Sequence, residues 1–441
     1  LPSDVEAAYA RLYEAEKSAL GHIVDRIDAD RTGDEELTED VDRLRDLASE
    51  GPVIRLVNHL ITRAVESRAS DIHIEPFQNR LAVRYRIDGI LREVTAPPMR
   101  HRAAILSRIK IMAKLNIAER RLPQDGRIRL AVQGRDFDLR VSTVPTLHGE
   151  SVVMRILDRS SLVCDMPSLG FLDDRAEPFL RVLAQPQGIV LVTGPTGSGK
   201  TTTLYSCLQR LNAPEKKLFT VEDPVEYQLE GVNQIQVKPQ IGLSFAHTLR
   251  SILRQDPDVI MIGEMRDLET AQIGIQAALT GHLVLSTLHT NSAAATVTRL
   301  LDMGVEDYLV TSTITGILAQ RLVRKLCPEC REPYAALPEL LAQLRMPASG
   351  SPANGPAMLY RPRGCNECHG TGYLGRIAVM EFLTMSDPLR RQVLRHAEAG
   401  EIHRIATDEG MHSMYDDGLL KVMAGVTSIE EVLRVTRDIA A

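Results

Sequence analysis

The spacing of hydrophobic positions predicts a mixed α+β arrangement in the first third of the chain. Apolar residues recur at helical spacing over Val53–Arg68. Segments that alternate apolar and polar residues follow, and they predict strands at Asp71–Glu75, Leu81–Ile87, Arg127–Val132 and Phe137–Val144. A helix is expected at His101–Ala118, with turns at Asp88-Gly89 and Gln133-Gly134. We therefore expect one small α+β domain over about 51–165.

From about residue 188 the apolar runs become short and contiguous. They predict strands at Gly188–Thr193, Lys217–Val221, Val259–Ile262 and His282–Leu288, with helical stretches between them. This alternation is typical of a parallel sheet with helices on its faces. We expect a second domain over 170–441 that ends in small helices after 385, and a hinge at Ser160–Ser168.

Composition and charge exclude several classes of protein. The chain is 44% hydrophobic and 25% charged, which is globular rather than disordered or fibrous. Residues 1–50 hold 15 acidic and 6 basic residues, and they predict an acidic helical linker or the remnant of an N-terminal docking domain. The remainder is nearly neutral, so no nucleic acid partner is expected. No apolar run approaches the roughly 20 residues that cross a bilayer, and no export signal opens the chain.

One loop carries a recognisable chemistry. Residues 194–201 match the pattern G-x-x-x-x-G-K-[ST] between a predicted strand and a predicted helix. The candidate nucleotide-binding residues are Gly194, Pro195, Thr196, Gly197, Ser198, Gly199, Lys200, Thr201 and Thr202. Glycines let backbone N–H groups turn toward phosphates, Lys200 supplies charge to the β and γ phosphates, and Thr201 offers a hydroxyl to Mg²⁺. Kinases, GTPases and motors share this loop, so it does not decide the reaction.

Acidic residues follow two of the predicted strands. Glu222–Glu226 comes after the strand that ends at Val221, and Gly263-Glu264 comes after the next predicted strand. Taken alone, an acid after a strand is usually a solvated turn. Hydrolysis of a bound triphosphate, however, needs one carboxylate at the attacking water and another near Mg²⁺. Downstream of a phosphate loop, the two segments therefore predict a hydrolytic site.

Four of the six cysteines form two CxxC pairs. These are Cys327, Cys330, Cys365 and Cys368, with 34 residues between the pairs. Four thiolates at this spacing predict a closed, structural Zn²⁺ site, and a redox role is the less favoured alternative. Cys164 and Cys207 have no such partners and are expected to be small buried residues.

With these motifs in place, the chain resembles the ATPases of type II secretion and type IV pilus assembly. Glu222–Glu226 resembles the "Asp box" of that family, Gly263-Glu264 its unusual Walker B segment and Thr280–His289 its "His box". Ser70–Pro76 (SDIHIEP) resembles a hallmark of the family's second N-terminal domain. The resemblance implies an α/β fold: a RecA-like P-loop ATPase domain, a smaller α+β domain before it, and a small zinc-binding element over 326–380.

The resemblance also implies roles for the carboxylates. Glu226 would act as the general base or orient the attacking water, and Glu264 would act at Mg²⁺ and the γ-phosphate. Glu222 would lie at the nucleotide. The residues alone leave open whether Glu222 or Glu226 is the base, and the resemblance favours Glu226.

Histidine and arginine side chains complete the implied site. His282 and His289 would sense or position the phosphate end of the nucleotide. Arg140 and Arg155 match arginines that reach the nucleotide from the N-terminal domain, where they would stabilise charge on the transferring phosphoryl group.

The implied activity is that of a hexameric motor that hydrolyses ATP with Mg²⁺ and powers pseudopilus assembly and protein export in type II secretion. It would lie in the cytoplasm at the inner face of the inner membrane, in contact with platform proteins of the GspL and GspF kinds. The four cysteines favour filament-assembling members over retraction ATPases. A type IV pilus assembly ATPase is the main alternative; a conjugation-type transfer ATPase and a scaffold that binds ATP without hydrolysing it are weaker ones.

Overall fold

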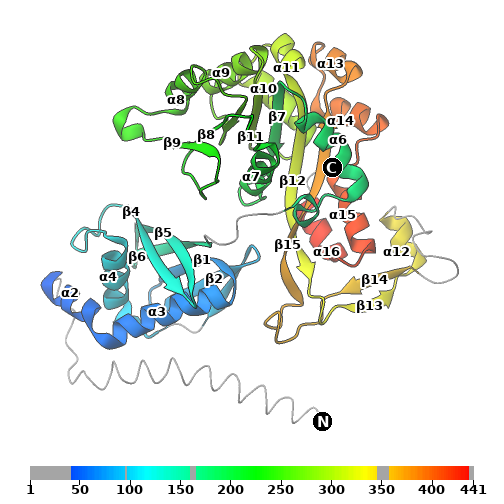
Figure 1. The fold of residues 1–441 in the computed structure, drawn as a ribbon. Coiled ribbons are helices and arrows are strands. Elements are labelled where there is room, and N and C mark those ends of the chain that lie inside the picture. Colours follow the sequence, from blue (N-terminus) through cyan, green and yellow to red (C-terminus); the bar gives the residue numbers. More distant parts are fainter. Residues whose placement is uncertain (1–40, 95–96, 159–164, 345–356, 437–441) are drawn as a thin grey trace. The chain divides into compact units, whose positions relative to one another are not determined.

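The structure, a computed structural model, describes residues 41–94, 97–158, 165–344 and 357–436. The chain divides into two compact units, residues 1–161 and residues 162–441 (Figure 1). Most of the acidic segment 1–50 lies outside the described residues, as do residues 160–164 of the expected hinge, including Cys164.

The first unit is a six-stranded antiparallel sheet in the order β3-β2-β1-β6-β5-β4. Its strands are β1 (Ala69–Pro76), β2 (Leu81–Ile87), β3 (Ile90–Val94), β4 (Gln124–Val132), β5 (Arg135–Thr146) and β6 (Gly149–Asp158). Its helices are α2 (Val41–Ser49), α3 (Gly51–Glu66), the short η1 (Met99–His101) and α4 (Arg102–Ala113). The four strands that the sequence predicts here are present, and the structure adds β3 and β6.

One face of this sheet is buried against helices. Leu60 of α3, Ile105 of α4 and Ile72 of β1 belong to one buried hydrophobic cluster. Along β1, the fully buried Ile72 and Ile74 stand on either side of the half-buried His73. This period-two pattern is that of a strand with one covered face, so the opposite face is left for polar residues.

Two predicted turns close hairpins in this sheet. Asp88 and Gly89 have φ values of 48° and 85°, and Gln133 and Gly134 have φ values of 50° and 79°. Each pair directly joins two paired strands, β2 to β3 and β4 to β5. Two consecutive residues in the left-handed region form the hairpin turn whose twist matches that of the strands.

Helix α4 is shorter than the sequence predicts and carries a buried charge. It ends at Ala113 because Lys114 takes a left-handed conformation with a φ of 59°, so the predicted extension to Ala118 is wrong. Inside the helix, Lys110 forms a 2.5 Å ion pair with Glu150 of β6, and both side chains are less than a tenth exposed. The pair links helix to sheet, since loss of either charge would leave the other buried without its partner.

The second unit is built on a seven-stranded sheet in the order β15-β12-β7-β11-β10-β8-β9, parallel except for β15. Its strands are β7 (Gly188–Thr193), β8 (Leu218–Glu222), β9 (Val232–Gln236), β10 (Val259–Ile262), β11 (Leu283–Leu288), β12 (Ile314–Leu326) and β15 (Tyr373–Thr384). Around it lie α5 (Met166–Leu169), α6 (Asp173–Leu183), α7 (Lys200–Leu211), η2 (Pro239–Ile241), α8 (Phe245–Ile252), α9 (Leu268–Leu279), α10 (Ala293–Asp302) and α11 (Asp307–Thr313).

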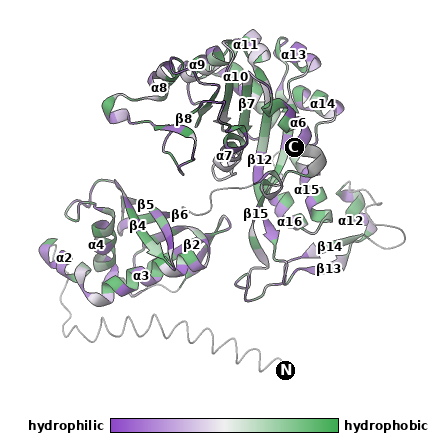
Figure 2. Ribbon diagram, viewed as in Figure 1, coloured by the Kyte–Doolittle hydropathy of each residue, from purple (hydrophilic) through white to green (hydrophobic). Residues whose placement is uncertain are grey.

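Strand β7 lies in the middle of this sheet and is buried along its whole length. Ile189 and Leu191 belong to one hydrophobic cluster, whereas Val190 and Val192 belong to another. Successive side chains therefore enter two cores on opposite faces of the sheet, which explains why the sequence shows a continuous apolar run. The flanking helices carry both hydrophobic and hydrophilic positions (Figure 2).

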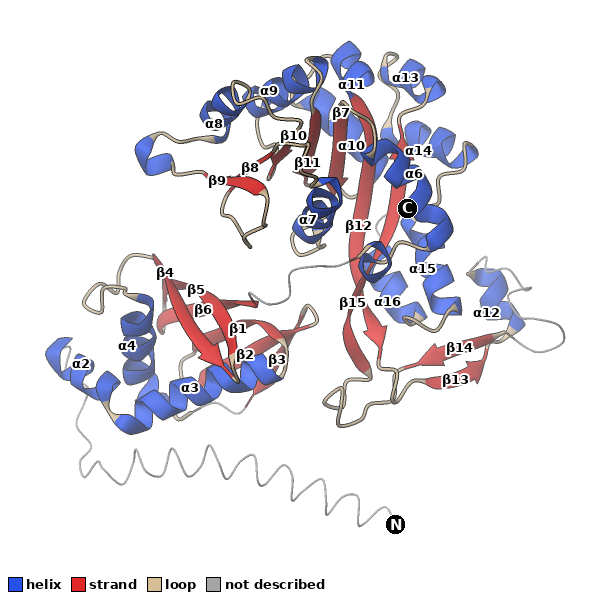
Figure 3. Cartoon of the chain, in the orientation of Figure 1, coloured by secondary structure: helices blue, strands red, loops and turns tan. Residues whose placement is uncertain are grey.

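The C-terminal part adds small elements beside the sheet. They are β13 (Glu332–Ala335), α12 (Pro338–Gln343), β14 (Met358–Arg361), α13 (Asp387–Val393), α14 (Ala399–Asp408), α15 (Met414–Met423) and α16 (Ile429–Thr436). The prediction of small helices after 385 is confirmed. Strands β13 and β14 form a separate antiparallel pair, near which the long β12 ends and β15 begins (Figure 3). Among the helices that the structure describes, none combines the length and the apolar character needed to cross a bilayer.

Candidate active site

The phosphate loop connects β7 to α7, as the sequence predicts. Gly194, Gly197 and Gly199 have φ values of 145°, 80° and 89°, which side chains rarely adopt. A Cβ atom on Gly194 would lie 2.3 Å from the main-chain oxygen of Gln320 in β12. Glycine is therefore required at that position for two reasons, its conformation and the close approach of the neighbouring strand.

Lys200 starts α7 and folds back over the loop. Its Nζ donates hydrogen bonds to the main-chain oxygens of Gly194 and Pro195, at 2.7 and 3.1 Å. Burial lowers the pKa of Lys200 to about 8, and the nearby Glu264 carboxylate partly opposes that shift. The loop therefore holds a lysine whose charged form is disfavoured by the loss of hydration, and a bound anion would stabilise that charged form. Thr201 and Thr202, next along the helix, are exposed.

Three predicted site residues meet at the carboxyl ends of adjacent strands. Nζ of Lys200 lies 3.5 Å from Nδ1 of His289, and Nε2 of His289 lies 3.5 Å from a carboxylate oxygen of Glu264. Glu264 follows β10, His289 follows β11 and the phosphate loop follows β7, so the parallel sheet gathers all three at one edge. Arg266 also pairs with Glu264, at 2.5 Å.

Glu222 is deeply buried at the end of β8. Its carboxylate accepts hydrogen bonds from the hydroxyl of Tyr205, from Thr220 at 2.5 Å and from Gln234 at 3.2 Å. Burial raises its pKa, although these donors act in the opposite direction. Through these three hydrogen bonds Glu222 links α7, β8 and β9.

Tyr205 joins this carboxylate to the main chain of Glu226. Its hydroxyl donates to Glu222 and accepts a hydrogen bond from the main-chain N–H of Glu226, at 3.2 Å. Because Tyr205 lies on α7, the helix that begins in the phosphate loop also fixes where the segment 222–226 runs. The side chain of Glu226 is half-buried.

The structure does not bring His282 to the phosphate loop. It precedes β11, and its main-chain oxygen accepts a hydrogen bond from Gly188, the first residue of β7. The loop follows the last residue of β7, so His282 lies at the opposite edge of the sheet, about 20 Å away at roughly 3.3 Å per strand residue. Its ring contacts Ala277 and Thr280 instead. Within one chain His282 therefore lies away from the phosphate loop, contrary to the expectation that it positions the phosphates.

Arg140 and Arg155 lie in the first unit, on the sheet face opposite α3 and α4. Cross-strand registers place Arg127, Arg140, Arg155 and Asp71 in one row across β4, β5, β6 and β1. Nε of Arg155 donates to the carboxylate of Asp71 at 3.0 Å, and this carboxylate is buried while Arg155 remains exposed. Asp71, within the SDIHIEP segment, thus fixes the Arg155 guanidinium through its Nε atom. The role of both arginines at a nucleotide remains a prediction.

The four cysteines form a compact cluster between β12 and β15. Their sulfur atoms all lie within 4.8 Å of one another. The Sγ–Sγ distances are 3.8 Å for Cys327 and Cys365, 3.8 Å for Cys330 and Cys368, and 3.7 Å for Cys365 and Cys368. Four thiolates about 2.3 Å from a tetrahedral Zn²⁺ would be about 3.8 Å apart, so the cluster could hold a metal ion.

Small residues and backbone amides surround the sulfurs. The N–H groups of Gly364 and Gly372 donate to Cys330 and Cys368, at 3.3 and 3.1 Å. A Cβ on Gly364 would lie 2.7 Å from the main-chain oxygen of Gly370, so the turn beside the cysteines closes only with glycine. Such donors stabilise thiolates, the form that binds a metal.

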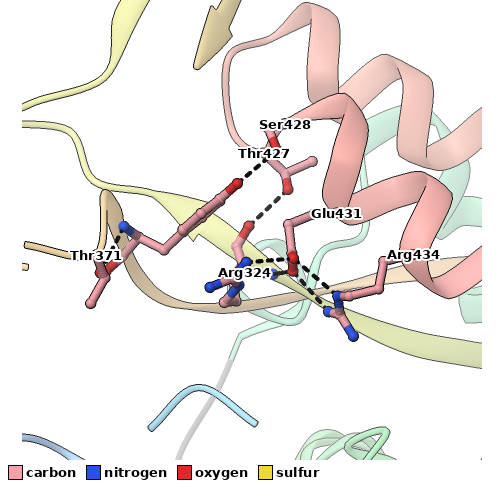
Figure 4. A network of polar contacts seen from close by, with 7 residues as sticks. Arg324, Thr371, Thr427, Ser428, Glu431 and Arg434 are labelled. Atoms are coloured by element: carbon pink, nitrogen blue, oxygen red, sulfur yellow. Dashed lines mark hydrogen bonds and ion pairs between the residues drawn. The ribbon is translucent and has the colours of Figure 1, made fainter. Parts of the chain in front are cut away.

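A polar network ties helix α16 to the strands that lead into this cluster (Figure 4). Glu431 of α16 accepts hydrogen bonds from Arg324 of β12 and from Arg434, both at distances between 2.7 and 3.0 Å. Burial raises the pKa of Glu431, but these donors outweigh it and lower the pKa to about 2. The Arg324 guanidinium also stacks on Tyr373, whose hydroxyl bonds to Ser428. The network fixes β12 and β15 just before the first pair of cysteines and just after the second.

Several residues at the site carry no motif and were not predicted. Tyr205, Gln320 and Arg266 bond to the predicted residues Glu222, Ser198 and Glu264. Arg266 stands two positions from Glu264, which was the available signal. Gln320 is more than a hundred positions from the loop in sequence, and only the pairing of β12 with β7 brings it there.

Comparison with known proteins assigns this geometry to a family. A family described as "Type II/IV secretion system protein" matches residues 46–434. The chain belongs to this type II/IV secretion family.

Relatives within the type II/IV secretion family are highly similar over most of their length. "Type II secretion system protein E" of Xanthomonas campestris pv. campestris is 63% identical over 99% of this chain and 76% of its own. "Type IV pilus assembly ATPase PilB" of Myxococcus xanthus is 49% identical over 97% of this chain and 76% of its own. The solved structure of the pilus retraction motor PilT with bound ADP is similar with a TM-score of 0.56 and 25% identity, over 85% of this chain and 95% of that one. The fold is thus that of the P-loop secretion ATPases.

The cysteine cluster makes a prediction about metal content. We expect about one zinc ion per chain, and we expect Cys368→Ser to lose it because three thiolates hold the ion far less tightly than four. Metal analysis of the purified protein measures the content, and hydrogen exchange of β13 and β14 reports the local loss of structure. Cys207→Ala is the matched control, since Cys207 is a free cysteine outside the cluster. Full retention of zinc in the Cys368 variant would contradict the four-thiolate site.

Proposed function

We propose that the chain is an ATP-hydrolysing motor subunit that powers pseudopilus assembly and protein export in type II secretion. The observation that carries the proposal is the convergence of Lys200, His289 and Glu264 on the phosphate loop. The loop would supply backbone amides for a triphosphate, and the other groups would lie beside its γ-phosphate. The 63% identity to a type II secretion protein E supports the choice of system.

Each residue has a distinct part in the proposed reaction. Lys200 binds the β and γ phosphates, and His289 contacts the γ-phosphate beside it. Thr201 and Glu264 would hold Mg²⁺, and the bound ion would supply positive charge beside the phosphates. Glu226 orients the attacking water or takes its proton. This assignment is supported by the three hydrogen bonds that engage Glu222 and leave it without a free role.

The proposal extends to assembly and location. We infer a homo-hexamer from membership of the type II/IV secretion family, with Arg140 and Arg155 stabilising charge on the phosphates of a bound nucleotide. The chain would act at the cytoplasmic face of the inner membrane through platform proteins of the GspL and GspF kinds. Zn²⁺ at the four cysteines would stabilise the local fold, since no ligand position is left open for chemistry.

The first test separates binding from turnover. Lys200→Ala should weaken ATP binding about 10- to 100-fold, because the phosphates lose a charged hydrogen-bond donor. Glu226→Gln should keep the affinity and lower kcat by about 100-fold or more, as expected on loss of a general base. Phosphate release and fluorescent-nucleotide titration measure the two quantities. Glu230→Gln is the control, an exposed glutamate on the same segment whose change should leave both unaltered. A full rate in Glu226→Gln would refute the assignment and favour a different base.

The second test uses the lowered pKa of Lys200. Below about pH 8 the lysine is already protonated, so ATP affinity should be constant there. Bound phosphates raise its pKa, so above pH 8 binding must take up a proton and the affinity should fall, by up to about tenfold per pH unit. Lys200→Arg keeps its charge throughout and should show a flat profile between pH 7.5 and 9.5. The same slope in both proteins would contradict the role of Lys200.

The third test decides between secretion systems. Hydrolysis should rise when the purified chain is mixed with vesicles that contain type II platform proteins, and should stay at its basal rate with the corresponding proteins of a type IV pilus. Stimulation by the pilus proteins alone would favour the type IV pilus alternative, which the 49% identity to PilB keeps open. Binding of ATP with no hydrolysis under either condition would instead support a scaffold that binds ATP without hydrolysing it.

A further inference from the structure

Gln320 is a fully buried polar residue that contacts the phosphate loop from the neighbouring strand. It lies on β12, one position past the residue that pairs with Thr193 at the end of β7, and is 1% exposed. Its Nε2 donates to the main-chain oxygen of Ser198 at 2.7 Å, and its Oε1 accepts from the hydroxyl of Thr203 at 2.9 Å. One side chain therefore grips both the loop and the first turn of α7.

The main chain of Gln320 also limits the loop at its other end. The main-chain oxygen of Gln320 would lie only 2.3 Å from a Cβ on Gly194, which leaves no room for a side chain there. The side-chain Nε2 of Gln320 would lie 3.2 Å from a Cβ on Gly199. The loop is therefore hydrogen-bonded to β12 at Ser198 and runs close to it at its first and last glycines.

The bond to Ser198 has a consequence for phosphate binding. In a trans peptide unit the C=O and the following N–H point in opposite directions. Because Gln320 draws the oxygen of Ser198 toward β12, the N–H of Gly199 points away from β12. Phosphate loops act through N–H groups that are aimed before the ligand arrives, and aiming them in advance removes an entropic cost from binding.

We propose that Gln320 is a positioning residue that presets the phosphate loop for the nucleotide; this inference rests on the proposed ATPase function. It touches no phosphate itself and acts through Ser198 and Gly199. Loss of its amide donor leaves the buried oxygen of Ser198 unpaired, and this peptide unit is then free to rotate. The N–H of Gly199 no longer points reliably toward the ligand.

The experiment compares variants that break one or both hydrogen bonds. Gln320→Leu removes both, and Gln320→Glu, measured at a pH at which its carboxylate is ionised, keeps an acceptor for Thr203 but loses the donor to Ser198. Both should weaken binding of a fluorescent ATP analogue about tenfold or more. Thr203→Ser keeps the hydroxyl and should bind the analogue as the wild type does. Thr203→Val loses the hydroxyl, and its affinity should lie between those of the wild type and the Gln320 variants. At saturating ATP, kcat should fall less than the affinity does, because the carboxylates remain in place.

Two measurements distinguish positioning of the loop from a purely structural role of Gln320. Thr313→Val removes a buried hydroxyl that bonds to Leu309 in α11, away from the loop, and should cost similar thermal stability without changing nucleotide affinity. Hydrogen exchange at Gly199 should be faster in the Gln320 variants and unchanged in Thr313→Val. Wild-type affinity in folded Gln320→Leu and Gln320→Glu would overturn the inference and leave the ATPase function standing. Failure of the wild type to bind ATP would instead overturn the proposed function.

Discussion

The close approach of β12 to the phosphate loop is the constraint on which the site depends. The loop turns between a fully buried strand and a helix, and the main chain of Gln320 leaves no room for a side chain at Gly194. Three glycines with positive φ let the chain follow this path, and the amide of Gln320 fixes one of its peptide units. The loop is thus shaped by a strand far from it in sequence as much as by its own residues.

Burial shifts the pKa values of two charged groups of the site, Lys200 and Glu222. Lys200 has lost part of its hydration and is held by two main-chain oxygens, which prepares it for an anion. Glu264 faces this cation through His289 and is paired with Arg266. Glu222 is engaged by three hydrogen-bond donors and serves the architecture. Carboxylates at neighbouring strand ends thereby lie in different electrostatic surroundings.

Strand β12 also connects the loop to the cysteine cluster. Gln320 contacts the loop, Arg324 pairs with Glu431 of α16, and Cys327 follows the end of the strand. A metal ion at the cluster would fix the far end of a strand whose middle braces the phosphate loop. The long pairing of β12 with β15 stiffens this connection along its length.

Local patterns determined much of the protein. The strand β7, the phosphate loop, the hairpin turns at Asp88-Gly89 and Gln133-Gly134, and the two CxxC pairs each depend on residues close together in the chain. Continuous apolar runs, glycines with positive φ and paired cysteines express their structure through local sterics and chemistry, so the sequence was sufficient for them.

The tertiary structure decided what depends on pairing between distant segments. The register of β12 against β7 placed Gln320 at the loop, and the direction of β11 placed His289 at the site and His282 at the opposite edge of the sheet. Packing gave Glu222 a buried position among three hydrogen-bond donors and left Glu226 half-buried, a difference in surroundings that the sequence did not show. Strand order, direction and burial arise from long-range packing, and no local pattern of residues encodes them on its own.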